Sequence, residues 1–293
     1  MNTAAAHPGG RNDIRSGIQR INEVISFPPV IAEIMDAMSS SDVTVAKVTE
    51  IVETDPALTA KILRVANSPF YGLRSDVTTI GQAFRLLGLD EIGQLLLTCQ
   101  MKSRLQSLDR RQHEQLERLW HHSVATAVAA RIIASRLHAG TEGKEYTAGL
   151  LHDMGKLVLI QYYPEEMATI VLLTESDTDE SEAERSVTGM PHTEIGRLVG
   201  EKWRLPKEYL DVMQFHHRPT AAPNAPLLTA IVRCADLLAE RWEYGIGEPS
   251  SALHPDDETL SLLFPSNAPD FDTWSEELRE PFQEKIAHFA DMM

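Results

Sequence analysis

Apolar residues recur with helical periodicity along nearly all of the 293-residue chain, whereas alternating strand patterns are scarce. Between residues 43 and 54, for example, Val45, Val48 and Val52 stand three or four positions apart and form one apolar stripe with Ile51. Such stripes become buried when helices pack against one another. The sequence therefore predicts an all-α fold.

Short helices with recognisable ends fill the first half of the chain. Asp55 can cap and Pro56 can open a helix that ends at residues 67–69, and another is expected from Ile80 to Leu87 with Gly88 as its stop. A longer amphipathic helix is expected over about 90–105. These segments indicate an N-terminal helical lobe over residues 19–106, preceded by a flexible terminus over residues 1–18.

A second helical set follows the polar stretch 107–118, which we interpret as a linking helix. The acidic stretch TESDTDESEAE, residues 174–184, is expected to be a solvated, mobile loop. This set defines a second lobe over residues 107–244. Its helices are expected near 119–137, 146–162, 192–203, 207–217 and 226–242.

The last segment, residues 245–293, is expected to be extended up to about residue 270 and helical thereafter. Asp272 can cap this final helix, and Pro281 can kink it. A periodic stripe should dock the helix on the body of the protein. The stripe consists of Trp274, Leu278, Phe282, Ile286 and Phe289.

Charge and composition exclude several classes of partner. The chain carries 27 Lys and Arg against 43 Asp and Glu, a net charge of −16, which would repel phosphate backbones and anionic lipid. It has neither an apolar run of about 20 residues nor a signal peptide. Cys99 and Cys234 lie in apolar helical patterns and read as buried thiols. We expect a cytoplasmic protein without general nucleic-acid or membrane binding.

Histidines concentrate in the second lobe, where two aspartates accompany them. Because neighbouring helical side chains point about 100° apart, adjacent His152 and Asp153 could reach two sides of one metal ion, or the carboxylate could bridge two ions. Only one of His121 and His122 can easily face inward, and we favour His122. The candidate ligands are His122, His152, Asp153, His192, His216, His217 and Asp236.

Mixed imidazole and carboxylate ligands suit divalent transition metals, namely Fe, Mn, Ni or Zn, one or two per chain. A pair of ions would lower the pKa of bound water and clamp a phosphoryl oxygen. Lys156 could neutralise charge that develops on the phosphate, so Asp153 and Lys156 are candidate catalytic residues.

A structural interpretation competes with this one. A single buried histidine is more often a hydrogen-bonded core residue than a ligand, and Asp153 could lie on a helix surface. Asp236 has apolar neighbours and needs a partner, but that partner could be Arg233 or Arg241.

The ordered set His122, His152 with Asp153, and Asp236 resembles the H…HD…D signature of the HD metal-dependent phosphohydrolase superfamily. FPPVIAEIM, IVETDPALTAKILRVANSPFYG, YTAGLLHDMGKLVL and IVRCADLLAERW extend the resemblance to the HDOD family of bacterial signalling proteins, over about residues 21–242. The resemblance implies two packed helical lobes, the second HD-like.

The resemblance also implies roles for individual residues. His122, His152, Asp153 and Asp236 match the ligands of one metal. His192, His216 and His217 match those that complete a second metal site in the related HD-GYP phosphodiesterases, and Lys156 matches their phosphate-facing lysine. Two features depart from that pattern. RPTAAPNAP follows His217 in place of the GYP signature, and Arg118 stands where a further carboxylate ligand would lie.

The leading hypothesis is a regulatory HDOD protein with a retained metal site that acts mainly through signalling proteins, either sensors or regulators. A nucleotide or second messenger is a further candidate ligand. The alternative is a metal-dependent phosphohydrolase acting on a nucleotide or phosphodiester. A third hypothesis is a metal-free polar network inside a helical scaffold.

Overall fold

A computed structural model describes residues 56–67, 77–88, 110–141, 143–176, 178–245 and 254–289, together with residues 49, 52 and 92. Every regular element in these ranges is helical, which confirms the all-α prediction. None of the described helices has the length and apolar character needed to cross a bilayer. The predictions for residues 1–18, Asp55, Cys99 and, apart from residue 92, the helix over 90–105 lie outside the described residues.

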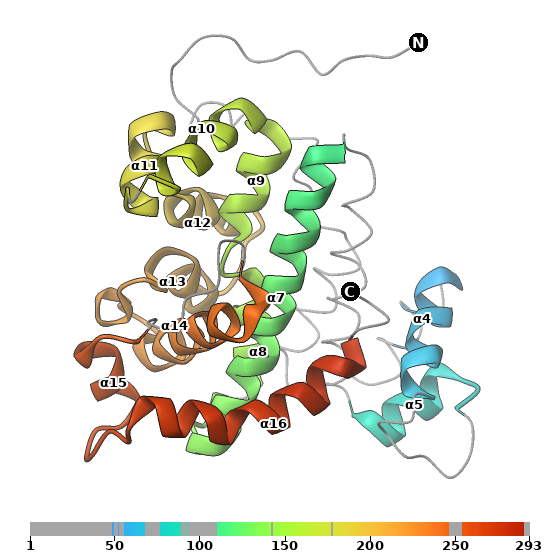
Figure 1. Ribbon diagram of the computed structural model, residues 1–293. Coiled ribbons are helices and arrows are strands. Elements are labelled where there is room, and N and C mark those ends of the chain that lie inside the picture. Colours follow the sequence, from blue (N-terminus) through green and yellow to red (C-terminus); the bar gives the residue numbers. More distant parts are fainter. Residues whose placement is uncertain are drawn as a thin grey trace, which may run out of the picture.

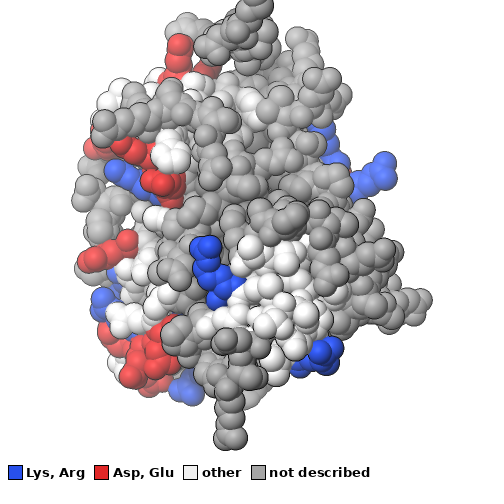
Figure 2. Space-filling model, turned by 90° about the vertical axis from the view of Figure 1, so that its right-hand side faces the viewer, with Lys and Arg blue, Asp and Glu red and all other residues white. Residues whose placement is uncertain are grey.

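Two short helices of the N-terminal half lie together at one side of the molecule, α4 (Pro56–Ala66) and α5 (Ile80–Leu87) (Figure 1). Thr79 and Gln82 form a capping box at the start of α5, and Gly88 ends it with a φ of 86°. These boundaries agree with the sequence prediction because the caps are local signals. On the face drawn in Figure 2, the described basic side chains are scattered and form no single patch.

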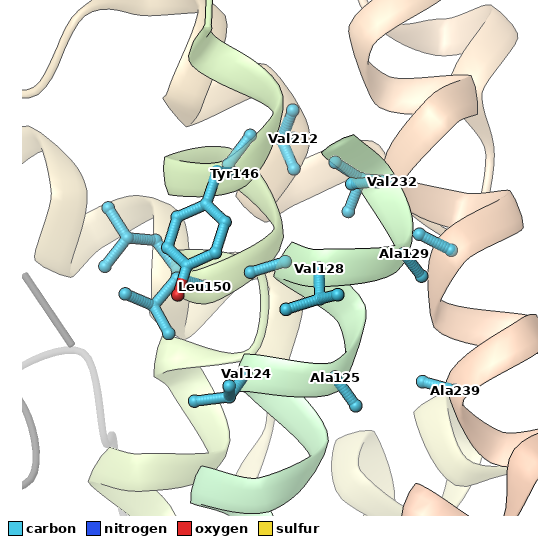
Figure 3. Packing of buried hydrophobic residues seen from close by; sticks show 14 of the residues in the cluster. Val124, Ala125, Val128, Ala129, Tyr146, Leu150, Val212, Val232 and Ala239 are labelled. Carbon is cyan, nitrogen blue, oxygen red and sulfur yellow. The ribbon is translucent and has the colours of Figure 1, made fainter. Parts of the chain in front are cut away.

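The long helix α7 (Arg110–Leu137) is the centre of the second half, and α8, α14 and α16 pack against it (Figure 1). The stretch 107–118, predicted as a separate linking helix, is continuous with α7 from Arg110 onward. Small and branched side chains let α7 sit deep in the core, where they meet residues of α8, α13 and α14 (Figure 3). The α7 residues labelled there are Val124, Ala125, Val128 and Ala129.

The expected single helix over 146–162 is two helices, α8 (Lys144–Leu151) and α9 (Met154–Tyr162). The break falls at His152 and Asp153, and Asp153 leaves helical geometry with φ −99° and ψ 21°. Periodicity alone could not reveal the break, because apolar residues continue on both sides of it.

The acidic stretch 174–184, predicted as a loop, is a loop only between Thr174 and Glu180. It contains the end of α10 (Pro164–Thr174) and the first half of α11 (Glu180–Thr188). The Asp179 side chain accepts a hydrogen bond from the Glu182 backbone and caps α11, while Ala183 and Glu184 are fully buried. Residues 180–184 are therefore helical, and the buried face of that helix includes a carboxylate.

The remaining helices of this half follow the predicted order: α12 (His192–Lys202), α13 (Lys207–Phe215), the short 3₁₀ turn η2 (Pro219–Ala221) and α14 (Pro226–Ala239). The helix expected to continue to residue 242 changes at residue 240 into a π-helical turn, η3 (Glu240–Tyr244). π-helical turns occur frequently at functional sites.

The C-terminal segment is more helical than expected. A short helix, α15 (Asp257–Leu263), interrupts the stretch predicted to be extended, because Asp256 caps it. The last helix, α16 (Phe271–Phe289), is capped by Asp270 instead of Asp272, and Pro281 lies within it. It packs against α7. The Phe289 side chain is outside the described residues, and the other members of the predicted stripe are buried: Trp274, Leu278, Phe282 and Ile286.

Candidate metal centre

Five separate segments bring the predicted ligand side chains to one point inside the second half. His122 comes from α7, His152 and Asp153 from the α8–α9 junction, and Asp236 from α14. His192 opens α12, and His216 and His217 follow α13. His122 is 1% exposed whereas His121 is only half-buried, in agreement with the choice between the two.

Two glycines allow the close approach of the helices that carry these residues. A Cβ atom at Gly149 in α8 would lie 2.8 Å from Ala127 Cα in α7. A Cβ atom at Gly155 in α9 would lie 1.9 Å from the carbonyl oxygen of His192 at the start of α12. Glycine is needed at both places because backbone there packs directly on backbone.

We define the first position as the point shared by His122, His152, Asp153 and Asp236. The Nε2 atoms of the two histidines lie 3.4 Å apart, and His122 Nε2 is 3.1 Å from Asp236 Oδ1. His152 Nε2 is 3.5 Å from Asp153 Oδ2. Ligands bonded at about 2.1 Å to one ion stand about 3.0–3.4 Å apart. The spacing therefore fits a shared transition-metal ion.

We define the second position as the point shared by His192, His216, His217 and Asp153. His192 Nε2 lies 3.4 Å from His216 Nε2, 3.2 Å from His217 Nε2 and 3.3 Å from Asp153 Oδ1. His216 Nε2 lies 3.6 Å from the same carboxylate oxygen. The three imidazoles form a group of potential ligands within 4.8 Å of one another.

Asp153 belongs to both positions because its two oxygens face opposite ways. Oδ2 faces His122 and His152, whereas Oδ1 faces His192 and His216. Among the described residues, Oδ1 has no hydrogen-bond donor although it is buried. A buried carboxylate oxygen without a donor is costly. This orphaned atom, lying among imidazole nitrogens, fits a bridging ligand between two cations.

The outer ring nitrogens of four histidines fix which nitrogen faces the centre. Nδ1–H of His122 donates to the Tyr244 carbonyl at 3.1 Å, and that of His152 donates to the Gly149 carbonyl at 2.7 Å. His216 donates in the same way to the Val212 carbonyl at 3.0 Å. In a neutral imidazole, the other nitrogen then carries a lone pair. Nε2 lone pairs thus point at carboxylate oxygens, an arrangement that a cation would stabilise.

Glu184, which the sequence reasoning missed, supports the fourth of these histidines. Its carboxylate is fully buried and accepts from His192 Nδ1 at 2.8 and 2.9 Å and from the His192 backbone N–H at 2.8 Å. A carboxylate behind a histidine ligand raises the basicity of the imidazole. The signal available in the sequence was the capping aspartate Asp179 followed by apolar Ala183 at helical spacing.

Lys156 lies beside Asp153, as the HDMGK spacing implied. Its Nζ is 3.1 Å from Asp153 Oδ2 and 3.0 Å from Glu180 Oε1. Burial works against the charge, but Asp153, Glu180 and Glu184 outweigh it and raise the pKa of Lys156 well above its usual value. Burial likewise opposes ionisation of Asp153, but Lys156 and the histidines hold its pKa well below the usual range. Both groups are therefore charged.

The carboxylates affect the histidines unequally. Burial lowers the pKa values of His152 and His216. Burial acts in the same direction on His122, but the hydrogen bond to Asp236 and the charges of the two aspartates raise its pKa overall. The aspartates of the first position therefore favour a positive charge at His122.

Of the two arginines predicted as alternative partners of Asp236, Arg233 contacts it. Arg233 donates to Asp236 Oδ2 at 3.0 Å, while Oδ1 of the same carboxylate faces His122. Arg241 pairs with Asp272 instead. Asp236 thus has an arginine on one oxygen and the first position on the other.

The HDOD domain family model matches residues 24–219, more than half of the chain, and the chain therefore belongs to the HDOD family. The match includes all the predicted ligands except Asp236, which lies beyond it on α14. The family resemblance inferred from the sequence is confirmed.

Solved structures of other bacterial proteins share this fold. An HDOD domain protein of unknown function from Geobacter sulfurreducens has a TM-score of 0.78 and 24% identity, covering 95% of this chain and 96% of that one. A candidate phosphohydrolase from Shewanella amazonensis SB2B has a TM-score of 0.71 and 24% identity, covering 95% and 98%. The likeness at these identities establishes the common fold.

Two further relatives are longer than this chain. A protein from Marinobacter aquaeolei VT8, named as a candidate signal transduction protein, has a TM-score of 0.73 and 22% identity. The match covers 94% of this chain and 64% of that protein. An uncharacterized protein of Treponema pallidum is 26% identical over 216 residues, which are 72% of this chain and 41% of that protein.

Proposed function

We propose that this chain is a cytoplasmic regulatory HDOD protein that binds one or two divalent transition-metal ions at the Asp153 cluster and acts mainly by contacting signalling proteins. The single observation that carries the metal assignment is the buried, two-sided Asp153 carboxylate, whose Oδ1 has no donor among the described residues. Four histidines whose Nε2 atoms face this carboxylate also support the metal assignment.

The chemistry of the donors favours Fe, Mn, Ni or Zn. The first position offers two nitrogens and two carboxylate oxygens, and the second offers up to three nitrogens and one oxygen. Hard ions such as Mg²⁺ prefer oxygen donors, whereas imidazole suits the transition metals. Two bound metal ions would act as Lewis acids and would lower the pKa of a water molecule bound to them.

Burial of the site favours regulation over rapid turnover. The ligand side chains of the first position are 5% exposed or less, and the Lys156 side chain is 8% exposed. A bulky substrate would have to displace surrounding groups before it reached the cluster. The shared fold with a protein named as a candidate in signal transduction supports the same choice.

The alternative function, hydrolysis of a nucleotide or phosphodiester, is favoured by Lys156. Its ammonium lies beside the bridging carboxylate, so it could neutralise a phosphoryl oxygen held near Asp153. A nucleotide or second messenger could equally serve as a regulatory ligand. The fold shared with the candidate phosphohydrolase from Shewanella amazonensis SB2B supports this function.

Metal analysis of protein purified without added ions tests the proposed site. We expect near-stoichiometric Fe, Mn, Ni or Zn in the wild type and little in Asp153→Asn. Protein that stays metal-free after incubation with each of these ions would instead support a purely structural network.

A partner assay separates the two functions. We expect a candidate sensor or regulator to bind the metal-loaded wild type and to bind Asp153→Asn more weakly, with no turnover in a screen of phosphomonoesters and cyclic nucleotides. Turnover by the wild type that is lost in both Asp153→Asn and Lys156→Met would establish the hydrolase instead.

A further inference from the structure

His217 differs from the other histidines of the cluster in what lies behind it. Arg233 Nη1 is 3.2 Å from His217 Nδ1. A guanidinium has only donors, so Nδ1 of His217 must accept. A ring whose Nδ1 accepts a hydrogen bond carries its one proton on the other nitrogen. That proton is then on Nε2, the atom that would have to bind a metal.

The proton on His217 has an acceptor ready. His217 Nε2 lies 3.2 Å from His192 Nε2, and His192 Nδ1–H donates to Glu184. The order of donors from Arg233 through His217 and His192 to Glu184 is therefore internally consistent. In this arrangement, the hydrogen bond from His217 occupies the Nε2 lone pair of His192. Both nitrogens are thereby withheld from the second position.

Arg233 also reaches the first position. The same Nη1 atom lies 3.0 Å from Asp236 Oδ2, so one guanidinium nitrogen joins a carboxylate of the first position to a histidine of the second. The Arg233 side chain is 23% exposed and can therefore move without unpacking the core.

We propose that Arg233 is a positioning residue that keeps the second position closed by holding His217 in its Nε2–H tautomer. The two positions then fill in sequence, and the second fills only after the Arg233–His217 hydrogen bond breaks. This inference rests on the proposed metal site, but the tautomer of the metal-free protein can be measured independently of it.

The direct test is long-range ¹H–¹⁵N NMR of the histidine side chains in chelator-treated, full-length protein. We expect the His217 proton on Nε2 and the His122, His152 and His216 protons on Nδ1. Arg233→Met should shift His217 toward Nδ1–H. An Nδ1–H tautomer of His217 in the wild type would overturn the proposal, whatever the protein does with metals.

Calorimetric titration with Mn²⁺ or Zn²⁺ tests the consequence. We expect the wild type to bind a second ion at least about tenfold more weakly than the first. Arg233→Met should raise the affinity of the second position about tenfold, the size of effect that residues behind metal ligands usually have. Loss of the arginine charge would by itself also raise the affinity for cations. The variant His217→Gln, alone and combined with Arg233→Met, separates this charge effect from the release of His217.

If Arg233 acts through His217, the gain at the second position disappears in Arg233→Met/His217→Gln, because the double-mutant cycle isolates the coupling. An equal gain with and without His217 would assign the effect to charge and overturn the proposal. If the wild type binds no ion, the proposed metal function fails, while the NMR result still tests the hydrogen-bond order.

Discussion

The two halves of the cluster share Asp153 but differ in how the protein supports them. At the first position, backbone carbonyls hold both histidines, and a second carboxylate, Asp236, adds negative charge. At the second position His192 and His216 face one shared carboxylate oxygen, and the extra carboxylate, Glu184, stands behind His192 instead of facing the centre. The difference predicts a firmly held ion at the first position and a more exchangeable one at the second.

The difference also has an architectural origin. The first position lies among α7, α8 and α14, which pack together, and η3 supplies the Tyr244 carbonyl. Phe282 of α16 packs against Trp242 and Tyr244 with ring centroids 4.5 and 5.4 Å apart, so the C-terminal helix supports that carbonyl. The second position depends on α12 and α13, which pack together, with α9 against α12.

Removing the shared carboxylate should have the largest effect. In Asp153→Asn the shape is kept but the charge is lost, so metal affinity should fall at both positions by at least about 100-fold, the upper limit of effects outside the ligand set. Elemental analysis after dialysis measures the loss. Asp256→Asn is the matched control, because asparagine is an equally good helix cap. One ion retained in Asp153→Asn would show that the carboxylate serves a single position.

Substitutions that push apart one pair of helices at a time should weaken the two metal positions independently. Gly155→Ala forces α9 from α12 and should weaken the second position, while Gly149→Ala forces α8 from α7 and should weaken the first. Overpacking should also destabilise each variant by about 1–3 kcal/mol, as measured by denaturant unfolding.

The matched control for the glycine pair is Gly81→Ala in α5. An added Cβ there meets only the Arg85 side chain at 3.8 Å, and stability should rise by up to about 1 kcal/mol. The distinction between the positions would be refuted if Gly149→Ala and Gly155→Ala reduced both ion sites equally.

Chelation should lower the thermal stability of the whole second half. An ion present at about 100 times its dissociation constant contributes about 2.7 kcal/mol, which corresponds to a fall in Tm of about 5–10 °C for a domain of this size. Differential scanning calorimetry with and without chelator measures it. Asp153→Asn should show no such shift, and an identical shift in that variant would mean that the stabilising ion binds elsewhere.

The smallest expected effect concerns the residue behind His192. Glu184→Gln keeps an acceptor for both N–H groups but removes the charge, and it should weaken the second position by about 10–100-fold while leaving the first unchanged. Competition titration with a chromophoric chelator resolves the two affinities. Equal weakening of both positions would argue that Glu184 acts on the whole cluster.

The sequence was sufficient to predict the residues that converge but not the way they are held. His122 was distinguished from His121 by helical periodicity, and Asp236 by its apolar neighbours. The break at His152 and Asp153 escaped prediction because apolar residues continue across it, and it is this break that lets Asp153 face two ways. Glu184 escaped because a run of acidic residues reads as solvated when each charge is counted separately.

Helix ends in the two halves show the same limit. The capping box at Thr79 and the stop at Gly88 are local and were readable, whereas α15 depends on a single cap at Asp256 within a stretch rich in proline and serine. The carbonyl that accepts from His122 belongs to Tyr244 in a π-helical turn, which α16 supports. His122 and Tyr244 stand more than a hundred positions apart in the sequence. No local pattern encodes such a contact.

Anomalous diffraction from crystals grown with Mn²⁺ would test the shared carboxylate most directly. We expect one strong peak among His122, His152 and Asp236 and a weaker one among His192, His216 and His217, about 3.5–4 Å apart with Asp153 between them. A map in which neither peak lies within bonding distance of Asp153 would contradict the metal centre.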